Sequence, residues 1–272
     1  MVTSVGRMFP AQIAIQPLPY LESLGTIFAR FGADTQGSGN ISYGVRTEDA
    51  RYFVKTAGDP ADTVPYLDFD GRVALLRNAV ELAQSVTHPA LPMLHAVIES
   101  PGGPLLVYEW REGELLSIRC AAHERFRALP AAEILTALDT LYALHADLDA
   151  AGWVEGDFFD AAMLYDFPTR RLTVFDLDTY RRGPHHNEMG RMFGSDRFMA
   201  PEQHSLGAPI DTRTTAYVMA RAALVLMPDP PAPQYAVLQE ATTTRFSSYP
   251  AFHQAWLAAS ATTPDSPTSR PT

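Results

Sequence analysis

The feature that most constrains the fold of this chain is a change in hydrophobic pattern near residues 111–113. Before this point, short runs rich in β-branched and aromatic residues alternate with turn residues, a pattern typical of strands. Residues 71–86 instead carry apolar side chains at the spacing of one helical face. The first part of the chain is therefore predicted to contain one main helix and five strands, at residues 26–31, 41–46, 51–56, 91–99 and 104–110.

The second part has mainly helical patterns, the longest over residues 131–151. One exception is a hairpin, predicted from β-rich runs at 163–166 and 172–175. From residue 261 Thr, Ser and Pro dominate without an apolar period, so the tail is predicted to remain disordered. These patterns predict an α+β fold with an N-terminal extension at 1–25, a sheet region at 26–110, a helical region at 111–260 and a tail at 261–272.

Composition excludes several classes of function. Of the 272 residues, 46% are hydrophobic and 19% charged, as in soluble globular proteins, and the net charge of −10 argues against binding nucleic acid. The single cysteine, Cys120, cannot form an intrachain disulfide, which suits a reducing compartment. Residues 1–20 make a poor signal peptide, and the apolar run 216–227 is too short to span a bilayer. We therefore expect a cytoplasmic protein without a membrane segment.

A glycine-rich turn comes before a strand lysine in the first part of the chain. Gly37, Ser38 and Gly39 lack large side chains, so their backbone N–H groups can approach phosphates. Lys55 follows between apolar strand neighbours, where its ammonium can point toward the phosphates of a nucleotide. Each feature alone also fits an ordinary hairpin or a solvated lysine. Their order and spacing favour a nucleotide-binding hairpin.

Two acidic motifs flank the hairpin predicted in the second part. Asp157 follows Glu155 and Gly156 in a loop, whereas Asp176 ends an apolar strand and has Asp178 two residues after it. Aspartates that follow a strand often only cap a turn. Here, however, the two motifs are followed by a further stretch, residues 194–202, that reads Gly-Ser-Asp-Arg-Phe-Met-Ala-Pro-Glu.

In this order the motifs resemble those of the bacterial-type Ser/Thr protein-kinase-like family, over roughly residues 26–257. The resemblance implies a two-lobed fold, with an antiparallel sheet and one helix in the N-terminal lobe, a mainly helical C-terminal lobe, and ATP with a divalent ion between them. By the same resemblance Lys55 would hold phosphates and Asp157 would align the acceptor hydroxyl. Asp176, together with Asp178, would bind Mg²⁺, with Mn²⁺ as the alternative ion.

The resemblance assigns roles to five more positions. Glu81, on the predicted helix, would orient Lys55. Glu109 and Trp110 would lie in a hinge whose backbone pairs with adenine. Glu202 would form a structural ion pair with Arg245.

The chain also departs from the family pattern. Ala162 stands where the family has a metal-binding asparagine, and Phe159 where kinases that act on Ser or Thr usually have lysine. Ser42 replaces a third glycine, and Thr215 replaces an aspartate that braces the catalytic loop. Asp160 is either a substitute metal ligand or a solvated loop residue.

These observations leave three functions open. The first is ATP-dependent phosphotransfer to a protein hydroxyl, with ATP and a protein substrate as partners. The second is a pseudokinase that binds nucleotide and acts as a scaffold, which the departures at Ala162 and Thr215 favour. The third is phosphotransfer to a small molecule, which Asp178 favours and the stretch 194–202 opposes.

Overall fold

The computed structural model of the chain describes residues 9–32 and 37–262. It divides into two compact units, Met1–Glu112 and Gly113–Thr272, two residues after the predicted boundary. Both units contain helices and antiparallel strands, so the fold class is α+β, as predicted. Within the described ranges no helix combines the length and the apolar character needed to cross a bilayer. Most of the predicted tail, residues 263–272, lies outside the described residues, as do residues 1–8 of the predicted extension.

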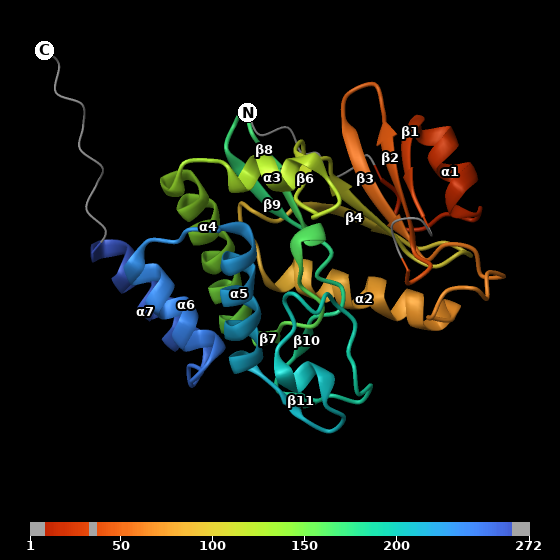
Figure 1. The fold of residues 1–272 in the computed structure, drawn as a ribbon. Helices are drawn as coiled ribbons and strands as arrows, with labels where there is room; N and C mark the ends of the chain where they lie inside the picture. The colour runs from red at the N-terminus through yellow and green to blue at the C-terminus, as the bar shows by residue number, and fades with distance from the viewer. Residues whose placement is uncertain (1–8, 33–36, 263–272) are drawn as a thin grey trace, which may run out of the picture. The chain divides into compact units, whose positions relative to one another are not determined.

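The described residues of the N-terminal unit form a five-stranded antiparallel sheet with the order β1-β2-β3-β5-β4 (Figure 1). The strands are β1 (Thr26–Phe31), β2 (Ile41–Arg46), β3 (Arg51–Thr56), β4 (Leu94–Ile98) and β5 (Leu105–Glu109). All five confirm strands predicted from the sequence. The last two are shorter than predicted, because Pro92 and Pro104 cannot donate a hydrogen bond to the sheet and the ladder begins only after them.

One face of this sheet is covered by residues 9–24, which include α1 (Pro17–Leu24). Leu21 is fully buried in a core cluster with strand residues such as Tyr43, Val45 and Tyr52. Phe9 meets Tyr52 edge to face, with ring centroids 5.1 Å apart. The sequence predicts residues 1–25 as an extension of the sheet region. In the structure, residues 9–24 instead belong to the hydrophobic core of the unit.

The opposite face packs against α2 (Phe69–Ser85), whose buried residues include Leu76 and Ala79, beside Leu106 of β5. The helix begins two residues earlier than predicted, because the Asp68 side chain caps it by accepting a 2.8 Å hydrogen bond from Gly71 N–H. Arg72, one turn into α2, is also fully buried.

The C-terminal unit is mainly helical. Its helices are α3 (Ala121–Arg127), α4 (Ala131–Ala150), α5 (Thr212–Leu226), α6 (Ala232–Thr242) and α7 (Tyr249–Thr262), and the last four lie together in Figure 1. The structure confirms the helix predicted at 131–151. Tyr142 of α4 packs edge to face against Phe252 and Trp256 of α7 and donates a 3.0 Å hydrogen bond to the carbonyl of Met219 on α5. Aromatic burial of this kind holds the helices together.

Short strands and two single-turn helices complete the C-terminal unit. The strand β6 (Glu114–Leu115) pairs with β8 (Met163–Asp166), and β8 pairs with β9 (Arg171–Val174). The predicted hairpin is therefore present as β8 and β9, with its second strand one residue earlier than expected. The remaining elements are β7 (Trp153–Val154), paired with β10 (Arg181–Arg182), β11 (His185–His186), paired with β12 (Pro209–Ile210), and the 3-10 helices η1 (Asp160–Ala162) and η2 (Pro201–His204).

Candidate functional site

The hairpin of the C-terminal unit brings two predicted site residues together. Asp157 precedes β8 and Asp176 follows β9, and these strand ends are neighbours because Met163 pairs with Val174. The Asp176 carboxylate lies close enough for its charge to raise the pKa of Asp157. Two acidic groups that are 19 positions apart in the sequence therefore act on each other.

Asp157 has the properties of a proton acceptor. Its Oδ1 atom is buried and has no hydrogen-bond partner among the residues that the structure describes. Burial, and then the charge of Asp176, raise the pKa of Asp157 to about 6, while the charge of Arg191 acts in the opposite direction. A carboxylate with a pKa near the working pH is suited to general base chemistry.

Asp176 and Asp178 offer carboxylates on one turn. Asp176 is exposed and has φ of 62°, in the left-handed region, whereas Leu177 between the two aspartates is buried. Such backbone strain is often found at functional sites. In the described ranges no group of three or more His, Cys, Asp or Glu side chains is placed to hold a metal ion. Two carboxylates fit Mg²⁺, which commonly takes one or two from the protein and its other ligands from phosphate and water.

Gly156, beside Asp157, has a steric reason to be glycine. A Cβ atom at this position would lie 2.2 Å from the backbone carbonyl oxygen of Thr179. The backbone before Asp157 therefore contacts the turn that carries Asp176 and Asp178. This contact leaves no room for a side chain at Gly156.

Glu155 connects the loop to two other elements. Its backbone N–H donates to Thr215 Oγ1 on α5 at 3.2 Å, and its carboxyl oxygens accept from Phe158 N–H at 2.7 Å and from Gln203 Nε2 at 3.2 Å. The Thr215 hydroxyl therefore connects this loop to α5. Burial is the main cause that raises the pKa of Glu155 to about 8.

This shift predicts a pH-dependent stability. Folded Glu155 keeps its proton up to about pH 8, whereas the unfolded side chain loses it near 4.5, so the unfolding free energy should fall as pH rises between these values. We expect Glu155→Gln to flatten this slope in denaturation measured at pH 5 and pH 8. Glu124→Gln, at an exposed position on α3, should keep the slope of the wild type. Equal slopes for all three proteins would contradict the assignment.

Asp160 does not serve as a substitute metal ligand in this structure. It is buried, both of its carboxylate oxygens accept from Arg197 Nη2, at 3.0 and 2.8 Å, and Oδ2 also accepts from Ile118 N–H at 3.1 Å. Ala162, two residues later, is buried and has no side-chain oxygen to offer. The missing asparagine is therefore not replaced by either neighbour.

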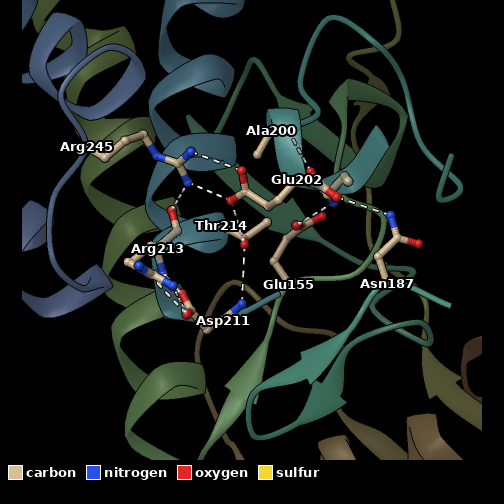
Figure 2. Close-up of polar contacts among 9 residues, drawn as sticks. Glu155, Asn187, Ala200, Glu202, Asp211, Arg213, Thr214 and Arg245 are labelled. Atoms are coloured by element: carbon tan, nitrogen blue, oxygen red, sulfur yellow. Dashed lines mark hydrogen bonds and ion pairs between the residues drawn. The ribbon is translucent and has the colours of Figure 1, made fainter. Parts of the chain in front are cut away.

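The ion pair predicted between Glu202 and Arg245 is confirmed (Figure 2). Arg245 donates to the two carboxylate oxygens at 3.0 and 2.7 Å, and Thr214 of α5 donates at 2.8 Å. Burial alone would raise the pKa of Glu202, but the hydrogen bonds from Arg245 lower it below its ordinary value. The pair fixes the end of the stretch 194–202 to the helices of its unit.

Removing this pair should lower stability moderately. We expect Arg245→Ala to cost about 1–2 kcal/mol, less than the ~3–5 kcal/mol of a fully buried pair, because 25% of Arg245 and 16% of Glu202 remain exposed. Arg77→Ala is a matched control, since Arg77 also makes two bonds to one carboxylate but the pair is about half exposed. Urea denaturation should show a larger loss for Arg245→Ala than for the control. Equal losses would show that the greater burial of the Glu202–Arg245 pair does not increase its contribution to the unfolding free energy.

The N-terminal unit positions the glycine-rich turn and Lys55. A Cβ atom on Gly39 would lie 2.4 Å from the Pro65 ring, and Arg72 donates a 3.2 Å hydrogen bond to the Gly39 carbonyl. Gly39 is therefore explained by local packing, whereas Gly37 is exposed and Ser38 half-exposed. Lys55, on β3 opposite Ser42, is buried with 6% of its surface exposed. Burial of an ammonium group is costly unless charged or polar groups compensate it.

The structure differs from the prediction at Glu81, the predicted partner of Lys55, and at Glu109 and Trp110, the predicted hinge. Glu81 is exposed on α2 and, among the described residues, makes no hydrogen bond or ion pair. It does not orient Lys55 here, because its side chain faces solvent. Glu109 N–H donates to Met93 O at 3.0 Å and Trp110 N–H to Arg51 O at 3.3 Å, so the sheet already uses both donors.

No protein-family model matches this chain, and a comparison with curated proteins finds no match either. Its function must therefore be argued from the geometry of the chain itself.

The composition of the chain gives a further signal for Lys55. Lys55 is the only lysine among 21 lysine and arginine residues. Arginine serves at every other basic position, which indicates that this position requires the compact ammonium of lysine. Asp160, Arg197 and Gly156 gave no comparable signal, because their partners lie far away in the sequence.

Proposed function

We propose that this protein is an ATP-dependent phosphotransferase with a kinase-like fold, which transfers the terminal phosphoryl group to a protein hydroxyl. The observation that carries the proposal is the buried, unpaired Oδ1 of Asp157 beside Asp176 at adjacent strand ends. A proton acceptor next to an acidic turn that fits a metal ion is the arrangement that phosphoryl transfer requires.

Each residue would have a separate part in the reaction. Asp157 would accept the hydrogen bond of the acceptor hydroxyl and take its proton as the oxygen attacks the terminal phosphorus, while the bond from this phosphorus to the bridging oxygen breaks and ADP leaves with the electron pair. Lys55 would neutralise phosphate charge. Asp176 and Asp178 would hold a divalent ion, which when bound supplies positive charge to the phosphates. The reaction depends on positioning and charge more than on covalent help from the protein.

A protein acceptor is favoured over a small molecule by the stretch 194–202. The ion pair of Glu202 with Arg245 fixes its end, and Gly194 near its start contacts Asp157. A fixed backbone beside the proton acceptor is suited to hold an extended polypeptide. The single cysteine suits a reducing compartment, and we propose a cytoplasmic location.

A nucleotide-binding pseudokinase is the second candidate. It is favoured by Ala162, which offers no metal ligand, and by Asp160, whose carboxylate is paired with Arg197. In that case the chain would bind ATP without transferring phosphate and act as a scaffold.

The lone lysine makes a direct test of nucleotide binding possible. Apart from the α-amino group, an amine-reactive reagent can modify only Lys55, and mass spectrometry can follow this single product. We expect ATP with Mg²⁺ to slow the modification, and Lys55→Met to weaken ATP binding at least about tenfold. Arg51→Met, a charge loss on the same strand, is the control. Equal modification with and without ATP would oppose both candidate functions.

Transfer of label from ATP to protein acceptors then separates the two candidates. Incubation with terminally labelled ATP, Mg²⁺ or Mn²⁺ and generic protein substrates should give labelled protein if the chain is a phosphotransferase. Protection of Lys55 without label transfer would instead support the pseudokinase. Label on small hydroxylated compounds but not on protein would reverse the choice of acceptor.

A further inference from the structure

The groups around Asp157 are mostly acidic. Asp176 and Glu155 lie near it, and Tyr180 is close enough for the charge of Asp157 to act on its hydroxyl. Arg191 is the cation whose charge opposes them. It comes from the segment between β11 and η2, in a different part of the sequence.

Arg191 also organises the backbone of its own segment. Its guanidinium donates to the carbonyls of Met192 and Gly194, both at 3.2 Å, and to Asp196 Oδ1 at 2.8 Å. Three acceptors within six residues are thus gathered around one planar group. About half of the Arg191 side chain remains exposed, so the segment is held from its solvent side.

The same segment touches Asp157 through Gly194. A Cβ atom on Gly194 would lie 3.2 Å from Asp157 Oδ1, and φ of Gly194 is 130°, which disfavours any other residue. The peptide whose carbonyl Arg191 holds therefore lies against the unpaired carboxylate oxygen. Movement of the Gly194 peptide would therefore change the surroundings of Asp157 Oδ1.

We propose that Arg191 is a positioning residue, which holds the segment 190–196 so that Gly194 lies against Asp157 and shapes the place of the acceptor hydroxyl. Its part in catalysis depends on the proposed phosphotransfer, whereas its hold on the segment does not. A displacement of about 1 Å at a reacting group can cost roughly a hundredfold in rate.

Hydrogen exchange tests the structural part in the full chain without any substrate. The amides of Met192, Phe198 and Met199 donate to carbonyls of Gln203 and Ser195, so their exchange reports on the segment. We expect Arg191→Gln to speed their exchange at least about tenfold, with α4 unchanged. Arg181→Gln is the matched control, since Arg181 is equally exposed and also pairs with a carboxylate, Glu188. Unchanged exchange in Arg191→Gln would overturn the proposal, whether or not the protein transfers phosphate.

Kinetics then test the coupling through Gly194. Arg191→Gln should lower kcat roughly tenfold to a hundredfold with little change in KM for ATP, and Arg191→Lys should restore part of the rate. If Arg191 acts through Gly194, Gly194→Ala should lower kcat similarly and the double variant should be hardly worse than either single variant. Additive losses, or an equal rise in KM, would reject the positioning role. A wild type without phosphotransfer would refute the proposed function alone, because exchange still decides on Arg191.

Discussion

Replacing Asp157 with asparagine is expected to lower the rate of phosphotransfer by about 10²–10⁴-fold, the usual contribution of a general base. Asparagine keeps the size of the side chain but cannot take the proton of the acceptor. Because Oδ1 of Asp157 has no partner among the described residues, the change breaks no hydrogen bond at that atom. Nucleotide binding should therefore change little, whereas the unfolding free energy should rise above pH 6, because the ionised carboxylate that burial disfavours is gone. Transfer of label from ATP measures the rate of phosphotransfer. Titration with ATP measures nucleotide binding, and urea denaturation measures the unfolding free energy.

The pH dependence gives this prediction a second readout. Since the pKa of Asp157 is about 6, the wild-type kcat/KM should fall as pH drops below this value, because the protonated carboxyl can no longer accept a proton. The residual rate of Asp157→Asn should lack this fall. Asp166→Asn, the same chemical change on the same hairpin, is the control and should behave as the wild type. Wild-type activity in Asp157→Asn would rule out Asp157 as the base.

The second large effect is expected for Gly156→Ala. The added methyl group would lie 2.2 Å from the carbonyl oxygen of Thr179, well inside the contact distance of the two atoms. The two backbone segments must then separate, which should cost about 3 kcal/mol of unfolding free energy. Since Thr179 follows Asp178 directly, the movement should also displace the acidic turn and weaken the binding of Mg²⁺ with ATP.

Gly152→Ala separates this steric effect from the general cost of replacing a loop glycine. Gly152 has φ of 82°, but no atom lies within 4 Å of an added methyl group, so the expected cost is only about 1 kcal/mol of backbone strain. Denaturation of both variants, with and without nucleotide, makes the comparison. A loss for Gly156→Ala no greater than for Gly152→Ala would mean that Thr179 does not contact Gly156.

The elements that could be predicted from the sequence are those whose own pattern specifies them. The strands from Thr26 to Thr56, the long helix α4 and the β8–β9 hairpin all have a clear period bounded by turn residues. The sequence also predicts that Asp157 and Asp176 flank this hairpin, and the pairing of Met163 with Val174 makes the adjoining strand ends neighbours.

The parts that escaped prediction depend on partners distant in the sequence. Nothing near Thr215 indicates that its hydroxyl meets Glu155, 60 positions earlier. The sequence leaves Asp160 as a metal ligand or a solvated residue, whereas in the structure both of its oxygens accept from Arg197, which lies 37 positions later. Likewise, Glu81 lies on the predicted helix α2, but its side chain is exposed. Propensity and period specify an element, whereas the partner of a polar side chain is decided by tertiary packing.

The segment 9–24 has a practical consequence for anyone who shortens this chain. A version that begins at Thr26 keeps every strand of the sheet but uncovers one of its faces, including Tyr43, Val45 and Tyr52. Contiguous apolar surface of this kind promotes self-association. Shortened versions should therefore start before Phe9. Poor solubility of a version that starts at Thr26 would not indicate that the full chain is poorly soluble.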